Sequence, residues 1–284
     1  MPELPEVETV KKGLEKAIVG KKIADYSCDT PKMTNFSLNK VKGLKVIGVR
    51  RRAKMLIIDL SADHHILVHL KMTGQLVYRS KKQCLIGGHQ IEKSCESLPN
   101  KFTHATFTFS DGTFLYYNDI RKFGWVRLYT KEQLAKVFEQ MGMGPEPLSK
   151  DFTIDYLRQR IRQRPRNRVK QFIMDNKILV GVGNIYSDEV CYYAKVRPDR
   201  RVETLTDKEI KLIHSGIAKI LKAAIEAQGT TFSNYVNADG EAGAYTKKLK
   251  VYGRYGETCF KCRGIVARMK IGGRTSSFCV HCQI

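Results

Sequence analysis

Two closely spaced cysteine pairs carry the strongest chemical signal in this 284-residue sequence. The pairs read CFKC and CVHC, and they contain Cys259, Cys262, Cys279 and Cys282. Four thiolates on two short turns predict one structural Zn²⁺ ion, because this ligand set and spacing are typical of tetrahedral zinc sites. An iron–sulfur cluster is a less favoured alternative. The metal would supply much of the folding free energy of so small a segment.

A glycine pair and an arginine lie between the two cysteine pairs. Gly272 and Gly273 predict a tight turn, and Arg274 follows them directly. A basic side chain at the tip of such a hairpin is placed to bind a phosphate group. A solvated side chain explains the same spacing equally well.

A run of basic residues reads RQRIRQRPRNRVK. Blocks of like charge are often solvated or flexible. Here Pro165 is expected to divide one helix from the next, which favours an ordered surface that binds phosphates. The run contains Arg158, Arg160, Arg162, Arg164, Arg166, Arg168 and Lys170.

The segment VGVGN follows the basic run. Its glycines predict a turn, with Asn184 as the N-cap of a helix that begins near Ile185. Backbone N–H groups at a helix start bind anions. The glycine spacing matches neither a dinucleotide-binding motif nor a P-loop, so we expect a DNA phosphate rather than a nucleotide.

Arg121 and Phe123 stand beside Gly124 in the segment NDIRKFGWV. Arginine and phenylalanine exposed together can insert into a stack of bases. From the spacing alone, Phe123 fits a hydrophobic core better.

The elements that position these residues begin with an N-terminal helix. In MPELPEVETV, Pro5 and Glu6 favour a helix start. Gly20 supplies a stop. Pro2 and Glu3 lie ahead of this helix, and the helical pattern gives them no role. Apolar residues recur at helical spacing at Val7, Val10, Leu14, Ala17 and Ile18.

Residues 41–130 have the pattern of β-strands. The segment 61–63 is a short polar turn between two apolar runs, and Asp111 with Gly112 is typical of a two-residue hairpin turn. Residues 80–101 break the pattern and are expected to form a long surface loop. Several strands preceded by one helix predict a β-sandwich or barrel with the helix packed against it.

Beyond residue 140 the pattern becomes helical. Residues 141–150 concentrate Gly and Pro and predict a linker. Thr206 and Glu209 are the ends of a capping box, and the helix that follows is expected to stop at Gly229. The sequence therefore predicts a multidomain α+β protein, with domains at 1–140, 152–244 and 245–284 and a linker at 141–151.

Charge and composition narrow the class of protein. The chain has 50 Lys and Arg against 28 Asp and Glu, and the net charge of +22 predicts a polyanionic partner, with nucleic acid favoured over a membrane surface. No apolar run approaches the length of a membrane span, and no secretory signal stands at the start. We therefore expect a cytoplasmic protein. The other cysteines are expected to be free thiols: Cys28, Cys84, Cys95 and Cys191.

Together these motifs resemble the formamidopyrimidine-DNA glycosylase family of base-excision repair, in its bacterial oxidised-purine branch. The shared features occur in the family's order over nearly the whole chain: MPELPEVET, RRAK before a strand, D-x-R-x-FG, MDN followed by VGVGNIY, the capped helix and the zinc finger. The resemblance implies an N-terminal β-sandwich with a leading helix, a helix–two-turn–helix domain and a terminal zinc finger. It also implies a nucleoid-associated monomer that binds double-stranded DNA containing oxidised bases.

The resemblance implies an activity as well. The family's enzymes are DNA glycosylases and AP lyases that remove 8-oxoguanine and formamidopyrimidines and cut the strand by β,δ-elimination. Once the initiator methionine is removed, Pro2 would be a secondary amine that forms a Schiff base with the damaged nucleotide. Glu3 would transfer protons, supported by Glu6. Lys54 is implied in the first elimination and Arg274 in the second.

Contacts with DNA are implied at further positions. The trio that fills the space of a flipped nucleotide would be Met72, Arg121 and Phe123. Phosphate contacts are implied for His69, Lys170, Asn184 and either Arg164 or Arg166. The segment from Thr230 to Lys248 resembles the loop that folds over the extruded base. One DNA-contacting histidine of the family is missing near residue 102, and His89 or His104 could replace it.

Two alternatives stay open at this point. Within the same class, the chain could excise oxidised pyrimidines. From another class, it could be a DNA-binding protein that keeps the fold and the finger without the chemistry.

Overall fold

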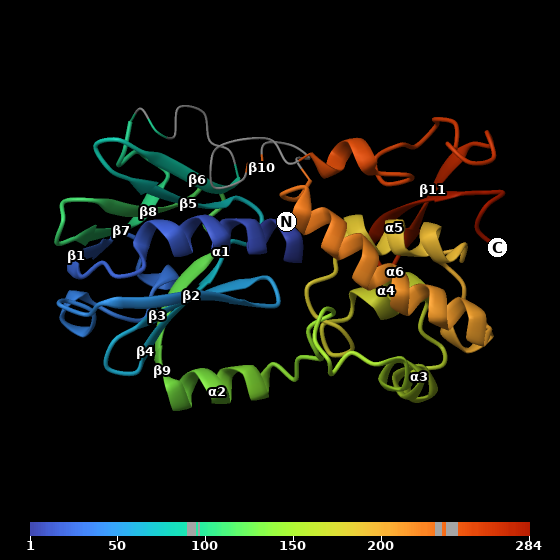
Figure 1. The fold of residues 1–284 in the computed structure, drawn as a ribbon, viewed down its shortest axis with the longest axis horizontal. Coiled ribbons are helices and arrows are strands. Elements are labelled where there is room, and N and C mark those ends of the chain that lie inside the picture. Colours follow the sequence, from blue (N-terminus) through green and yellow to red (C-terminus); the bar gives the residue numbers. More distant parts are fainter. Residues whose placement is uncertain (90–94, 96, 231–234, 237–243) are drawn as a thin grey trace. The chain divides into compact units, whose positions relative to one another are not determined.

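The computed structural model describes residues 1–89, 95, 97–230, 235–236 and 244–284 (Figure 1). These residues divide into two compact units. The first comprises Met1–Gln140 with Ile225–Thr246, and the second comprises Met141–Ala224 with Lys247–Ile284. Residues 225–246 thus group with the N-terminal part of the chain, although the predicted boundaries assign them to the helical domain and the finger.

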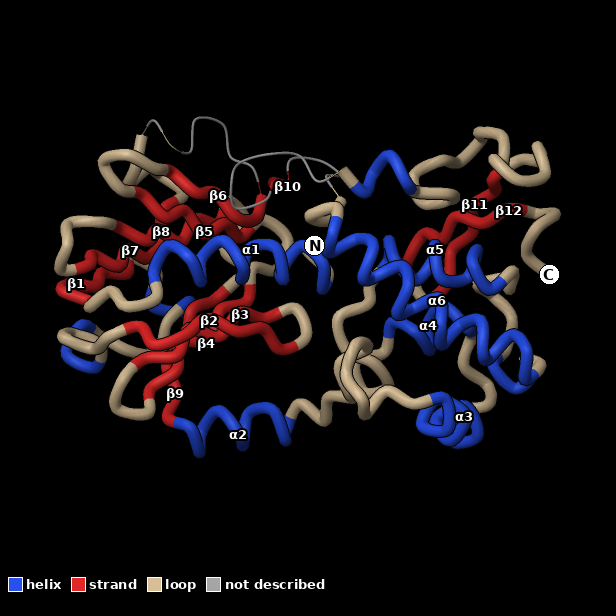
Figure 2. Tube along the Cα trace, in the orientation of Figure 1, coloured by secondary structure: helices blue, strands red, loops and turns tan. Residues whose placement is uncertain are grey.

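Two antiparallel sheets form the first unit, and their strands are red in Figure 2. Both sheets contribute to one hydrophobic core, for example through Phe107 and Ile58. This arrangement confirms the predicted β-sandwich. The six-stranded sheet has the order β1 (Ile23–Cys28), β7 (Thr103–Phe109), β8 (Phe114–Asp119), β5 (Gly74–Arg79), β6 (Cys84–His89) and β10 (Tyr235–Val236). The four-stranded sheet has the order β2 (Val46–Arg52), β3 (Met55–Leu60), β4 (His64–His69) and β9 (Trp125–Thr130).

The predicted N-terminal helix is α1 (Leu4–Ile18), and it packs against β2 and β6. Four of the five apolar positions identified by their spacing are buried, namely Val7, Val10, Leu14 and Ile18, and Ala17 is half-buried. Gly20 follows the helix with a φ of +91°, a left-handed conformation that favours glycine. The leading helix therefore closes one side of the sandwich core.

Two predicted turns are present. Ala62 and Asp63 connect β3 to β4, and both have a φ near +57°. β7 and β8 form the predicted hairpin, but its loop spans residues 110–113 rather than two residues. The loop is longer because the Asp111 side chain accepts hydrogen bonds from the N–H and the hydroxyl of Thr113, which makes a local turn of its own.

The prediction of a surface loop over residues 80–101 is wrong for residues 84–89, which form β6. The glycines in this strand resemble a loop signal, but they allow close packing. A Cβ atom on Gly87 would lie 2.7 Å from a Val10 methyl of α1. The prediction of free thiols is also wrong for Cys84 and Cys95, which form a disulfide.

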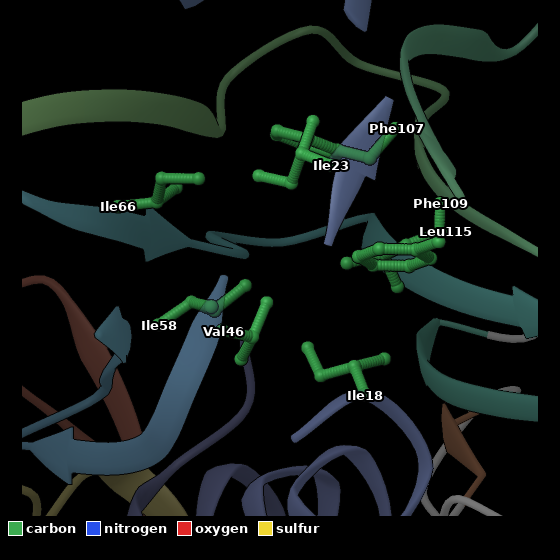
Figure 3. A pocket seen from close by; sticks show the side chains of 8 residues that line it. All are labelled: Ile18, Ile23, Val46, Ile58, Ile66, Phe107, Phe109 and Leu115. Carbon is green, nitrogen blue, oxygen red and sulfur yellow. The ribbon is translucent and has the colours of Figure 1, made fainter. Parts of the chain in front are cut away.

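A small cavity lies between the two sheets (Figure 3). All the side chains that line it are aliphatic or aromatic, and they come from α1 and from both sheets. The volume of the cavity is about 10 Å³, which is at the lower limit for one water molecule. It is too small and too apolar for a nucleobase, so it is a packing gap and not a substrate site.

The helices of the second unit follow α2 (Lys131–Gln140), which ends the first stretch of unit one. Thr206 and Glu209 form the predicted capping box, because the Thr206 N–H donates to Glu209 Oε2 at 2.8 Å and the Glu209 N–H donates to Thr206 Oγ1 at 3.3 Å. The helices are α3 (Ile154–Gln163), α4 (Val169–Met174), α5 (Asn184–Ala194) and α6 (Asp207–Glu226), and the last two residues of α6 group with unit one. A hairpin of β11 (Val266–Ile271) and β12 (Arg274–Cys279) completes this unit.

Short 3-10 helices occur at Pro31–Met33, Leu38–Lys40, Val202–Thr204 and Tyr245–Lys248. Within the described ranges, no helix has both the length and the apolar character needed to cross a membrane.

Candidate active site and nucleic-acid interface

The N-terminus is built into the first turn of α1. Pro2 is buried, and Glu3 is the N-cap residue of the helix, with only 3% of its surface exposed. The Glu3 N–H donates to Glu6 Oε2 at 2.9 Å, and the Glu3 side chain accepts from the first turn in return. This capping box gives Glu3 and Glu6 a structural role that the helical pattern alone does not reveal. It also fixes the position of Pro2.

Glu6 connects the N-terminus to a distant part of the chain. Its Oε1 accepts hydrogen bonds from the N–H of Thr230 at 2.9 Å and from the Thr230 hydroxyl at 3.0 Å. Gly229 approaches the Glu6 side chain so closely that an added Cβ would lie 3.0 Å from Oε1. Thr230 also pairs with Ala244 in an isolated bridge. Most of the loop expected to fold over the base, 231–234 and 237–243, lies outside the described residues.

Lys54 occupies the turn between β2 and β3 and is buried. Ala53 beside it has a φ of +55°. Burial, with added repulsion from Lys71 and Lys54, lowers the pKa of His69 to about 3. His69 is therefore neutral near pH 7, and its Nδ1 accepts the Lys71 N–H at 3.0 Å. The proton then sits on Nε2, which leaves a neutral donor for a phosphate oxygen.

The three predicted space-filling residues lie on two neighbouring loops. Met72 follows β4, and Arg121 and Phe123 follow β8. Met72 is 41% exposed and Phe123 is 54% exposed, so neither is a core residue. The Arg121 guanidinium stacks on the Phe123 ring, 4.5 Å from its centroid. An exposed Arg–Phe stack is suited to contact bases.

Asp119 organises these two loops, and the sequence reasoning assigned it no role. It is fully buried. Its carboxylate accepts hydrogen bonds from the Arg121 N–H at 3.1 Å, the Gly124 N–H at 2.8 Å and the Thr73 hydroxyl. In the sequence, this role could have been found from the D-x-R-x-FG motif, whose aspartate stands two residues before Arg121.

The structure does not support His104 as a DNA contact. His104 is 2% exposed, and its Nδ1 lies 3.0 Å from Asp29 Oδ1 while its Nε2 lies 3.0 Å from the Asp119 carbonyl oxygen. Both ring nitrogens are thus bonded inside the protein. His89, at the end of β6, is the remaining candidate, and desolvation together with the N-terminal ammonium lowers its pKa.

The second unit carries the basic run. Pro165 lies between α3 and α4, as predicted. Arg164 is paired with Asp175 at 3.0 Å, and Arg158 is paired with Asp155 and Asp207. Arg166 is exposed and forms no ion pair with any described residue, so it is the better placed of the two predicted phosphate contacts.

Lys170 does not fit the predicted role of a phosphate contact. Its side chain is 1% exposed, and Nζ forms an ion pair with Asp188 at 2.7 Å and a hydrogen bond with the Thr275 carbonyl at 3.1 Å. Asp188 also accepts from the Ser276 hydroxyl at 2.6 Å and the Ser277 N–H at 2.8 Å. This network joins α4 and α5 to β12, the strand that begins with Arg274.

Asn184 is the first residue of α5 rather than its N-cap, which is Gly183. The shift is one residue. Gly183 has no side chain that could cap the helix.

The four predicted metal ligands come together. The sulfur atoms of Cys259, Cys262, Cys279 and Cys282 all lie within 4.8 Å of one another. The described residues therefore contain a cluster that could hold a metal ion. Arg274 is exposed at the other end of the hairpin, after two glycines with positive φ.

The chain is similar to known proteins over its whole length. The profile of the formamidopyrimidine-DNA glycosylase N-terminal domain matches residues 1–126, and that of the formamidopyrimidine-DNA glycosylase H2TH domain matches residues 143–236. A formamidopyrimidine-DNA glycosylase of Pediococcus pentosaceus is 37% identical over 100% of this chain and 99% of its own. One from Heliobacterium modesticaldum is 36% identical and covers all of both chains.

Solved structures of the Lactococcus lactis enzyme Fpg are similar to the whole chain. Its complex with DNA containing an abasic site has a TM-score of 0.87 at 32% identity, over 99% of each chain. Its complex with DNA containing N7-benzyl-Fapy-dG has a TM-score of 0.88 at 32% identity, also over 99% of each chain.

A β-sandwich with a capped N-terminal proline helix, a helical H2TH domain and a four-cysteine hairpin define a DNA-binding glycosylase of DNA repair. The chain belongs to the formamidopyrimidine-DNA glycosylase family.

Proposed function

We propose that this glycosylase removes oxidised purines, such as 8-oxoguanine and formamidopyrimidines, through a Schiff base on Pro2 and then cuts the strand by β,δ-elimination. The observation that carries the proposal is the buried capping box that holds Pro2, Glu3 and Glu6 together at the start of α1. A helix start does not require a proline at position 2. When Met1 is removed, this proline becomes a secondary amine that can act as a nucleophile.

The Pro2 nitrogen would attack the anomeric carbon of the damaged nucleotide. The glycosidic bond breaks, the base leaves with its electron pair, and loss of the nitrogen proton with opening of the sugar ring gives an iminium ion. Glu3 stands next in the chain and would supply the proton that the ring oxygen takes up. Glu6 would support Pro2 through the cap, because its Oε2 accepts from the Glu3 N–H while its Oε1 accepts from the N–H and the hydroxyl of Thr230.

The same side of the sandwich would hold the strand. Lys54 and the neutral His69 provide two donors of different charge to the phosphates around the lesion. The iminium ion acidifies the neighbouring C2′–H, and loss of that proton expels the 3′ phosphate as the first elimination. We assign Arg274 to the second elimination, which expels the 5′ phosphate.

The four-cysteine cluster fits a structural zinc ion. Sulfurs at the corners of a zinc tetrahedron lie about 3.8 Å apart, given Zn–S bonds of about 2.3 Å. Here the Cys259–Cys282 and Cys262–Cys279 sulfur distances are 3.9 and 3.4 Å. All four ligands are sulfur and leave no position open for water, so the ion would stabilise the hairpin that presents Arg274 and take no part in the chemistry.

Borohydride trapping tests the proposal. The chain is incubated with duplexes that carry 8-oxoguanine or an oxidised pyrimidine, beside a Pro2→Gly variant and a chain whose amino terminus is acetylated. Intact mass first establishes that Met1 is absent. We expect a covalent adduct with the 8-oxoguanine duplex that disappears on acetylation.

Each outcome has one meaning. An adduct with only the pyrimidine lesion would reassign the substrate. Binding without any adduct would contradict the Schiff-base mechanism. Product ends that show β- but no δ-elimination would contradict the role of Arg274.

A further inference from the structure

An exposed aromatic ring lies on the first cysteine turn of the finger. Phe260, between Cys259 and Cys262, is 63% exposed, and among large apolar side chains of the described residues only Ile284 is more exposed. The Arg254 guanidinium carbon lies 3.5 Å from the centre of the Phe260 ring, which is a stacking distance. The ring therefore rests on Arg254 and keeps most of its surface exposed to solvent.

Arg254 is a fixed support. Its Nε donates to Glu257 at 2.9 Å, Nη1 to the Lys250 carbonyl at 2.8 Å and Nη2 to the Thr258 carbonyl at 2.9 Å. Its side chain is only 13% exposed. Three acceptors hold the Arg254 guanidinium in place. The Phe260 ring therefore has a fixed support before any ligand binds.

A second ring repeats the arrangement nearby in the chain. Tyr255 is 56% exposed, and the Arg268 guanidinium lies 4.1 Å from its centre. Lys250 lies 5.2 Å from the Phe260 ring. Within residues 249–284, Glu257 is the only acid against seven Lys and Arg, and Glu257 is already paired with Arg254. The surface is thus aromatic and strongly cationic.

We propose that Phe260 and Tyr255 form a binding site for unpaired bases of single-stranded DNA. Stacking on an exposed ring needs a free base face, and bases inside a duplex have none. The cations beside the rings supply the attraction to the phosphate backbone. An acidic peptide would use the cations but would leave the two supported ring faces without a function.

This site is distinct from Arg274. The hairpin pairs Val266 with Cys279 at the cysteine end and Ile271 with Arg274 at the other. Five residues of strand separate the two ends by about 17 Å. The inference does not rest on the proposed base excision, since it concerns a separate surface and undamaged single strands.

Fluorescence anisotropy with a labelled oligothymidylate tests the site. The zinc-loaded full chain is compared with Phe260→Ala, Phe260→Tyr and Ile265→Ala at several salt concentrations. Ile265 is a matched control, because it is 51% exposed on the same finger but stacks on no guanidinium. We expect Phe260→Ala to weaken binding roughly 5- to 100-fold, as loss of one stacked base does.

The other measurements make the result specific. Phe260→Ala removes no charge, so the slope of log affinity against log salt should stay the same. Phe260→Tyr and Ile265→Ala should bind the single strand as the parent chain does. Zinc content, binding of a lesion duplex and borohydride trapping should all be unchanged in Phe260→Ala, which separates this site from the proposed enzyme activity. Unchanged single-strand affinity in Phe260→Ala, or an equal loss in Ile265→Ala, would overturn the inference.

Discussion

At the residue scale, buried charged side chains hold in place the loops and strands that carry the exposed residues expected to contact DNA. Asp119 is the main example in the first unit, because its carboxylate binds the Thr73 hydroxyl in the loop that carries Met72 and two backbone N–H groups in the loop that carries Arg121 and Phe123. Lys170 and Asp188 have the same function in the second unit, where they bind residues of β12, the strand that begins with Arg274. None of these three buried groups needs to touch DNA to affect how the protein binds it.

We expect Asp119→Asn to lower the free energy of unfolding of the first unit by about 1–3 kcal/mol, because an amide NH₂ would face an N–H donor in a buried place. Binding of a duplex with an abasic-site analogue should weaken with it. Urea unfolding can be followed through Trp125, the single tryptophan, which lies in the first unit. Asp111→Asn, at the exposed hairpin turn, is the control and should cost less than 1 kcal/mol. Equal stabilities of the two variants would contradict the assigned role.

His69 should make the first unit sensitive to acid. Its pKa is about 3 in the folded chain against 6.5 ordinarily, so between these values the unfolded chain binds the extra proton. The stabilisation is complete above about pH 6.5 and is lost as the pH falls towards 3. From pH 6.5 to pH 4.5, the free energy of unfolding should fall by about 2 kcal/mol less in His69→Asn than in the parent chain. Parallel pH profiles from Trp125 fluorescence would disprove this.

At the element scale, β6 is a strand whose glycines resemble the composition of a loop. Gly87 faces Val10 of α1 too closely for any side chain, and the Cys84–Cys95 disulfide ties the start of the strand to the segment that follows it. β6 also pairs with β10, so it joins the sandwich to residues late in the chain.

We expect reduction of the Cys84–Cys95 disulfide to destabilise the first unit by about 3 kcal/mol, the entropy of the loop it closes. The test compares thermal unfolding with and without dithiothreitol. Cys84→Ser should behave like the reduced chain and should not respond to the reductant. Cys28→Ser, which removes a free thiol, should respond like the parent chain. If dithiothreitol leaves the parent chain's melting temperature unchanged, the disulfide is not a stabilising element.

At the scale of the whole molecule, the net charge affects DNA binding, whereas the four-cysteine cluster affects the stability of the finger. The charge of +22 provides attraction to any DNA sequence and should make binding fall steeply with salt. A metal ion held by the four-cysteine cluster would stabilise the hairpin that carries Arg274 at its turn, because the four cysteines all lie within residues 259–282.

Removal of the metal with a strong chelator should therefore leave the first unit folded. We expect Trp125 fluorescence to stay constant, the four cluster thiols to become reactive to maleimide, and duplex affinity to fall on the order of tenfold through lost phosphate contacts. Re-addition of Zn²⁺ should restore the affinity. Simultaneous loss of the Trp125 signal would show that the finger is needed for the first unit as well.

The family, the clustering of the four cysteines, the N-terminal helix, the hairpin at Asp111 and the capping box at Thr206 could all be predicted from the sequence. These features depend on residues close together in the chain, whose spacing states their geometry directly. The exposed Arg121 and Phe123 were also expected, but from the resemblance and not from their pattern.

The packing of the chain in three dimensions sets which polar residues are buried. It buried Lys170 and His104, which a basic or histidine-containing motif places on the surface, and it turned the glycines of β6 into a packed strand. It also brought Thr230 to Glu6, 224 residues away. The physical reason is common to all of these: burial and hydrogen bonding of a side chain depend on partners distant in the chain, and no local pattern records them.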